Sequence, residues 1–72
     1  MDIILPGLSE RLKYLRKTRK IKQEEIAEYL KCSVRQYQRM EYGEVNLPVL
    51  TLIALADYFN VTTDYLLGRE ER

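Results

Sequence analysis

The chain has 72 residues, 46% of them apolar, with twelve Lys or Arg, eleven Asp or Glu, one cysteine and no histidine. A chain of this length buries only about 60% of its unfolded surface, which leaves little room for a small-molecule cavity. Without histidine there is no Ser-His-Asp or Cys-His pair, and one thiol excludes an intrachain disulfide and a multi-thiolate metal site. We therefore expect one domain over residues 1–72, with no catalytic site, metal, cofactor or small-molecule ligand.

The net charge of +1 hides an uneven distribution of charged side chains. Residues 1–43 hold ten basic and six acidic side chains, whereas residues 44–72 hold two basic and five acidic ones. Such an asymmetry indicates a surface that binds phosphate, although a solvated basic helix is the alternative interpretation. The short apolar run that ends at Pro6 and Gly7 fits neither a signal peptide nor a membrane span, which predicts a cytoplasmic protein.

Capping residues and apolar spacing predict a first helix from about Ser9, as its N-cap, to Arg19. Its apolar face consists of three leucines at helical spacing: Leu8, Leu12 and Leu15. A second helix is predicted over residues 23–30, because two acidic residues in its first turn favour a helix start. Its inward-facing residues are Ile26, Ala27 and Leu30.

A third helix is predicted to open at Ser33, with Gln36 completing a capping box, and to close at Gly43, which suits a left-handed C-cap. The second and third helices, joined by a tight turn, span residues 23–42. This is the length of a helix-turn-helix, whose second helix enters the DNA major groove.

A fourth helix is predicted from near Pro48 to Asn60. A short fifth helix is predicted to be capped by Thr62 and to end at Gly68. A charged tail follows over residues 69–72. The predicted core residues of the fourth helix are Val49, Leu52, Ile53, Ala56 and Phe59. Five helices and no strand alternation beyond the first residues predict an all-α fold, a compact five-helix bundle that contains the helix-turn-helix.

A helical wheel of the third helix separates two sides. One side carries Ser33, Gln36, Tyr37, Met40 and Glu41, and the other carries Val34, Arg35, Gln38, Arg39 and Tyr42. Arginine pairs with guanine O6 and N7, glutamine with adenine N6 and N7, and valine methyls pack on the thymine methyl. The predicted base-reading residues are therefore Val34, Arg35, Gln38 and Arg39. An exposed polar face that contacts nothing is the alternative.

Four segments carry a family resemblance: residues 23–27 (QEEIA), 32–33 (CS), 39–43 (RMEYG) and 61–68 (VTTDYLLG). In this order they resemble the phage-repressor helix-turn-helix family (Cro/CI-like, also called XRE), over about residues 8–68. The resemblance implies a lambda-repressor-like DNA-binding domain that acts as a dimer on a pseudo-palindromic operator. It implies a transcriptional regulator, a repressor, whose partner is double-stranded DNA.

The same resemblance assigns roles to individual residues. Positions that match phosphate-contacting residues of the family are Lys22, Gln23, Ser33, Tyr42 and Asn46. Helix capping is the alternative role for Gln23 and Ser33, since a helix start needs its amides satisfied whether or not phosphate is near. Arg16 and Glu41 match a buried structural ion pair that locks the third helix against the first, with phosphate binding as the alternative for Arg16.

Some positions depart from the family pattern. Lys20 and Lys31 stand where glycine commonly ends the first two helices, which predicts either a strained left-handed residue or another turn geometry. Pro48 lies one position later than usual, and Tyr37 replaces a branched aliphatic residue between the two motif helices. These changes leave the loop course and the packing between the helices open, while the fold is expected to survive.

A second apolar stripe on the fourth helix predicts a homodimer face formed by Leu50, Ala54 and Tyr58. Its predicted extension consists of the fifth helix and the apolar start: Met1, Ile3, Ile4 and Leu5. Singly scattered surface apolar residues are the alternative interpretation. The stripe also fits a rival function, an antitoxin-like or other protein-interaction module. An enzyme would need a nucleophile or a metal, and Cys32 is the only candidate thiol. Because Cys32 lies in the motif turn as a small core residue, an enzyme is not expected.

Overall fold

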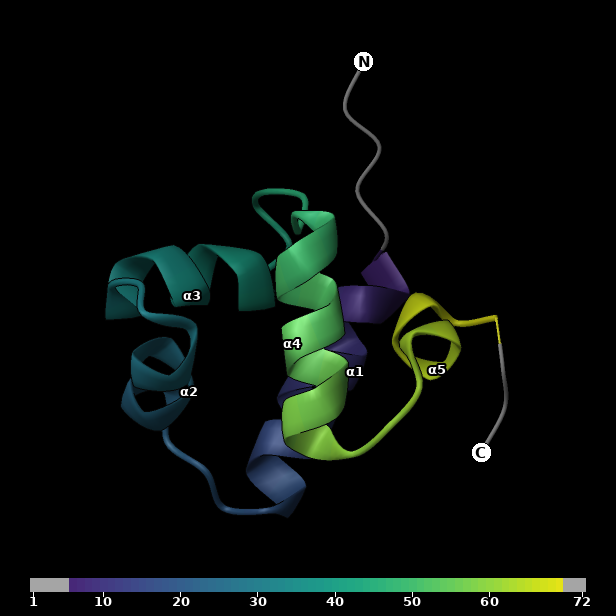
Figure 1. The fold of residues 1–72 in the computed structure, drawn as a ribbon, viewed down its shortest axis with the longest axis horizontal. Helices are drawn as coiled ribbons and strands as arrows, with labels where there is room; N and C mark the ends of the chain where they lie inside the picture. Colours follow the sequence, from purple (N-terminus) through teal and green to yellow (C-terminus); the bar gives the residue numbers. More distant parts are fainter. Residues whose placement is uncertain (1–5, 70–72) are drawn as a thin grey trace.

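The computed structural model describes residues 6–69, and every regular element in this range is helical. The elements are α1 (Pro6–Thr18), α2 (Gln23–Leu30), α3 (Val34–Glu41), α4 (Val49–Phe59) and α5 (Thr63–Leu67). α4 crosses in front of α1, with α2 and α3 on one side and α5 on the other (Figure 1). The predicted all-α five-helix fold is confirmed for this part of the chain. None of its helices has the length and hydropathy of a membrane-spanning segment.

Short-range hydrogen bonds fix the starts of α3 and α5. The Ser33 hydroxyl accepts from the backbone N–H of Gln36 at 3.0 Å, and Gln36 Oε1 accepts from the backbone N–H of Ser33 at 2.9 Å. The Thr62 hydroxyl accepts from the backbone N–H of Tyr65 at 3.0 Å. These bonds satisfy amides that have no partner inside their helices, which confirms the predicted caps.

The predicted start of the first helix is wrong. α1 begins at Pro6, because a proline is tolerated in the first turn, where its missing N–H would have no partner. Ser9 is therefore not an N-cap. Ser9 lies within the sequence of α1, and its side chain is buried in the bundle. Its hydroxyl donates to the backbone carbonyl of Glu41 and so joins α1 to the end of α3.

The turns after α1 and α2 use lysine where glycine would be unstrained. Lys20 has a φ of 57° and Lys31 a φ of 59°, which places both in the left-handed region. Each conformation costs on the order of 1 kcal/mol for a residue with a Cβ atom. Both side chains are exposed, so the turns keep their left-handed geometry without crowding the core.

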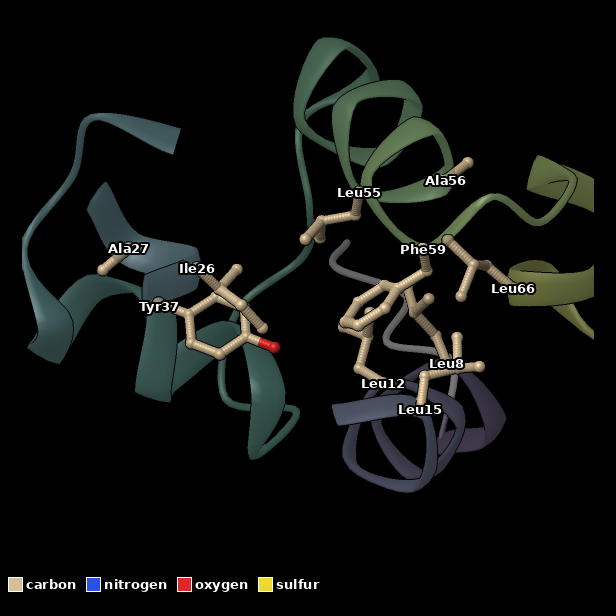
Figure 2. Close-up of a cluster of buried hydrophobic side chains, with 10 residues drawn as sticks. All are labelled: Leu8, Leu12, Leu15, Ile26, Ala27, Tyr37, Leu55, Ala56, Phe59 and Leu66. Carbon is tan, nitrogen blue, oxygen red and sulfur yellow. The ribbon is translucent and has the colours of Figure 1, made fainter. Parts of the chain in front are cut away.

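The core lies where α1, α4 and α5 meet and extends into the space between α2 and α3 (Figure 2). Its buried apolar members are Leu8, Leu12, Leu15, Ile26, Ala27, Tyr37, Leu55, Ala56, Phe59 and Leu66. Tyr37 is completely buried beside Ile26, so the tyrosine that replaces a smaller residue is accommodated as a core side chain. Burial raises the pKa of its hydroxyl, and the nearby carboxylate of Glu41 raises it further.

The predicted core face of α4 is partly wrong. Val49 is 71% exposed and Ile53 is 44% exposed, whereas Leu55 is completely buried. Ala56 and Phe59 are buried as predicted. Because α4 is apolar around most of its circumference, its periodicity cannot decide which side faces the core. The packing of Leu55 and Phe59 against the rest of the bundle decides it, and it leaves Val49 and Ile53 on the surface.

Candidate nucleic-acid interface

The outer side of α3 presents the residues predicted to read bases. Arg35 and Arg39 are exposed, and Gln38 is half-buried. Val34 is also half-buried, because it packs against the edge of the core, so it offers less surface to a partner than the wheel suggests. A surface hollow beside this helix is lined by Arg35, Gln38, Arg39, Tyr42 and Glu44. The structure thus brings three of the four predicted base-reading residues to one concave polar surface.

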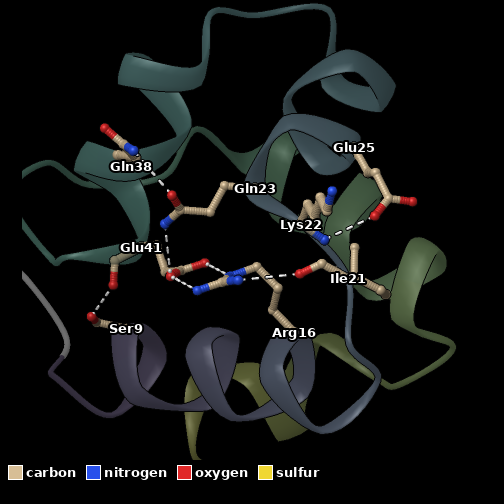
Figure 3. A network of polar contacts seen from close by, with 8 residues as sticks. All are labelled: Ser9, Arg16, Ile21, Lys22, Gln23, Glu25, Gln38 and Glu41. Carbon is tan, nitrogen blue, oxygen red and sulfur yellow. Dashed lines mark hydrogen bonds and ion pairs between the residues drawn. The ribbon is translucent and has the colours of Figure 1, made fainter.

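The predicted ion pair between Arg16 and Glu41 is present (Figure 3). Arg16 Nε donates to Glu41 Oε2 at 2.7 Å and Arg16 Nη2 donates to Glu41 Oε1 at 3.0 Å. A third bond, from Arg16 Nη1 to the carbonyl of Ile21 at 3.1 Å, fixes the guanidinium on the turn after α1. Burial alone would raise the pKa of Glu41, but the hydrogen bonds from Arg16 outweigh it and hold that pKa below its ordinary value.

A chain of side-chain hydrogen bonds extends from this carboxylate to the surface of α3 (Figure 3). Gln23 Nε2 donates to Glu41 Oε1 at 3.1 Å, and Gln38 Nε2 donates to Gln23 Oε1 at 3.0 Å. A carboxylate only accepts, so Gln23 must turn its NH₂ group toward Glu41 and its carbonyl toward Gln38. Gln38 is therefore held by its NH₂ group, and its carbonyl oxygen points away from the network (Figure 3).

A polar stripe on α1 attaches the end of α3, and one of its members escaped prediction. Ser9, Lys13 and Arg16 are four and three residues apart and share one side of α1. Lys13 Nζ lies 5.5 Å from the ring centre of Tyr42, the C-cap of α3. The sequence carried a partial signal for this contact, because Lys13 lies one turn before Arg16 on α1 and Tyr42 directly follows Glu41.

The positions predicted to contact phosphate lie at three helix ends. Lys22 is exposed before α2, and its backbone N–H donates to Glu25 Oε1 at 2.9 Å. Ser33 caps α3, while Tyr42 and Asn46 are exposed at the end of α3 and in the following loop. Gln23 differs from the others, because both ends of its amide are engaged within the protein. The structure thus shows a capping role for Ser33 and a bracing role for Gln23.

The residues predicted as a dimer face are only partly exposed. Leu50 is 79% exposed, but Ala54 and Tyr58 are half-buried. The ring of Tyr58 packs against that of Tyr29, with 4.7 Å between the ring centres. The exposed apolar surface of α4 consists of Val49, Leu50 and Ile53, and we call it the α4 apolar face. The predicted extension over Met1, Ile3, Ile4 and Leu5 lies outside the described residues.

Comparison with known proteins identifies this arrangement of helices. A family model described as helix-turn-helix matches residues 12–66. The chain belongs to the helix-turn-helix family. This match confirms the family predicted from the motifs, and it includes α2, α3 and the buried ion pair. A comparison with curated proteins found no match.

Solved structures that share the fold of this helix-turn-helix protein include a transcriptional regulator and a repressor. One is a transcriptional regulator from Listeria innocua, with 32% identity and a TM-score of 0.82, over 90% of this chain and 61% of the regulator. The chain thus spans less than two thirds of that protein. The other is the P22 c2 repressor in complex with a synthetic operator, with 27% identity and a TM-score of 0.79, over 88% and 96% of the two chains. Family and fold are those of DNA-binding transcription regulators and not of enzymes.

Proposed function

We propose that the helix-turn-helix protein is a transcriptional repressor that binds operator DNA with α3 in the major groove. The observation that carries the proposal is the concave surface on α3, where Arg35 and Arg39 are exposed and the amide of Gln38 is held in one orientation. The related P22 c2 repressor binds a synthetic operator, which supports the same use of this fold here. Such a regulator works where the DNA lies, so we place it in the cytoplasm.

Two sets of side chains have different roles in the proposed interface, one toward the DNA backbone and one toward the bases. Lys22, Tyr42 and Asn46 lie at helix ends and loops, where they can contact the DNA backbone and fix the position of α3. Arg35 and Arg39 can each make paired hydrogen bonds to guanine in the major groove. Gln38 presents an acceptor, which suits the amino group of adenine or cytosine.

Substitutions in the two sets are expected to differ in kind. Arg35→Ala and Arg39→Ala should each lose about 1–3 kcal/mol of binding free energy on the preferred sequence and relax the preference at particular base pairs. Lys22→Ala should weaken binding to all sequences alike, because a phosphate contact carries no sequence information. Selection of bound sequences from random DNA at fixed salt gives the preferred site, and anisotropy titrations then give the affinities. Equal losses on preferred and random DNA for all three variants would contradict the base-reading assignment.

We also propose that the protein binds as a homodimer through the α4 apolar face. Val49 and Leu50 are 71% and 79% exposed, and Ile53 follows one turn later on the same side of the helix. A symmetric pair would set two copies of α3 about 34 Å apart, one turn of DNA, and read a pseudo-palindrome. Asp57 is also exposed, one turn after Ile53, so the two carboxylates must stay in water at the edge of such an interface.

Analytical ultracentrifugation tests the dimer. The unaltered chain at tens of micromolar is expected to sediment as a dimer, and Leu50→Glu is expected to sediment as a monomer, because the new charge would be buried in the interface. Tyr14→Glu is the matched control, since Tyr14 is 62% exposed on α1, outside that face. The proposed interface is contradicted if the unaltered chain sediments as a monomer, both alone and on DNA, and Leu50→Glu does not change its sedimentation. A different protein held on this face would instead favour the protein-interaction module.

A further inference from the structure

The backbone at the end of α3 places an acidic residue beside Arg39. Gly43 has a φ of 77° and donates its N–H to the carbonyl of Met40 at 3.2 Å, while Glu44 donates its N–H to the carbonyl of Arg39 at 2.9 Å. This is a Schellman ending with Tyr42 as the C-cap. In this motif the second residue after the C-cap, here Glu44, lies against the third residue before the C-cap, here Arg39. That contact is commonly apolar, but here it joins Arg39 and Glu44.

The two side chains form an ion pair whose geometry leaves one end of the guanidinium open. Arg39 Nε lies 3.6 Å from Glu44 Oε1, and the side chains are 53% and 57% exposed. A pair this exposed contributes little to the stability of the fold, because solvent and salt screen it. Among the described residues, the terminal nitrogens Nη1 and Nη2 of Arg39 have no hydrogen-bond partner. Arg39 and Glu44 line the same hollow as Gln38 and Tyr42.

We propose that Glu44 is a positioning and specificity-determining residue for Arg39. Its carboxylate attracts the Nε side of the guanidinium, which leaves Nη1 and Nη2 to make the paired hydrogen bonds that guanine O6 and N7 accept. Its own charge repels phosphate, which disfavours any docking that would place Arg39 on the backbone instead of a base. This inference rests on the proposed function of α3, and it adds to the interface an acidic residue that the charge pattern of the sequence did not indicate.

The test compares Glu44→Gln with Glu28→Gln. Both variants remove one exposed negative charge, but Glu28 lies on α2 and forms no ion pair with Arg39. Anisotropy titrations at fixed salt would use three DNAs. They are the preferred site, random DNA, and the preferred site altered at the base pair where Arg39→Ala relaxes the preference. Both variants are expected to bind random DNA more tightly. Only Glu44→Gln should also lose about threefold to tenfold of the discrimination at that one base pair.

A double variant separates positioning from general electrostatics. If Glu44 acts through Arg39, Glu44→Gln should have no further effect on base preference in an Arg39→Ala background, because the side chain it positions is gone. The inference is overturned if Glu44→Gln and Glu28→Gln change all affinities by the same factor while the unaltered chain still prefers one sequence. Absence of a preferred sequence for the unaltered chain would overturn the proposed function as well. Because the Glu44 side chain is exposed and its capping bond uses the backbone, the variant is expected to fold.

Discussion

Glu41→Ala is expected to lower the free energy of unfolding by about 3–5 kcal/mol, because removing one member of a buried ion pair strands the other. Arg16 is only 16% exposed in its side chain, and its guanidinium would lose both hydrogen bonds to the carboxylate. Gln23 would lose its acceptor at the same time, so the hydrogen-bond chain to Gln38 would end without an anchor. Urea denaturation followed by circular dichroism measures the loss.

Two controls make this result specific to the ion pair. Glu28→Ala removes an exposed carboxylate from α2 and is expected to change stability by no more than about 0.5 kcal/mol. The double variant Arg16→Met with Glu41→Leu removes both charges and should recover much of the loss, since apolar residues of similar volume can replace a buried pair. A loss below about 1 kcal/mol for Glu41→Ala would mean that the pair contributes no more than an exposed one.

The carboxylate of Glu41 also makes the free energy of unfolding depend on pH in the acid range. The pKa of Glu41 is lower in the folded chain than in the unfolded chain, so the unfolded chain takes up the proton first as the pH falls. The contribution of the ion pair is fully present above the ordinary carboxyl pKa and is lost as the pH falls through the lowered value. The double variant that lacks both charges should therefore lose less stability on acidification than the unaltered chain.

Affinity for DNA is expected to fall about 10³-fold to 10⁴-fold between 50 and 200 mM salt. If each half-site engages three or four phosphates, the dimer neutralises about 6–8, which gives a slope of roughly −5 to −7 in a plot of log affinity against log salt. Lys22→Ala should make the slope shallower by about 2 in the dimer, one unit for each protomer. Gln38→Ala should leave the slope unchanged. Titrations at four or more salt concentrations measure these slopes, and a flat response would contradict a phosphate-bound interface.

The sequence predicted those features that neighbouring residues determine. The caps at Ser33 and Thr62, the end of the fourth helix at Asn60 and the glycine that ends α3 all depend on contacts within a few residues, and the structure confirms each of them. The family resemblance extended this to one long-range contact, the ion pair between α1 and α3.

Features that depend on how helices face one another were predicted less well. Ser9 resembled a cap because its partner, the carbonyl of Glu41, is 32 residues away in the sequence. The side of α4 that faces the core was misjudged, because apolar residues surround most of that helix. Glu44 was missed for a different reason: the charge count placed it in the acidic half of the chain, whereas the turn at Gly43 folds it back against α3.

The hydrogen-bond chain that ends at Gln38 limits how the binding preference of this protein can be redesigned. Arg35 has no ion pair with the described residues, and Arg39 has one exposed partner in Glu44, so both can be exchanged as surface positions. Gln38 is tied through Gln23 to the carboxylate that joins α1 to α3. An α3 helix grafted from another protein would therefore have to keep partners at positions 38 and 41 for Gln23 on α2 and Arg16 on α1. Without them, a new base preference would come with a loss of the contacts that attach α3 to the bundle.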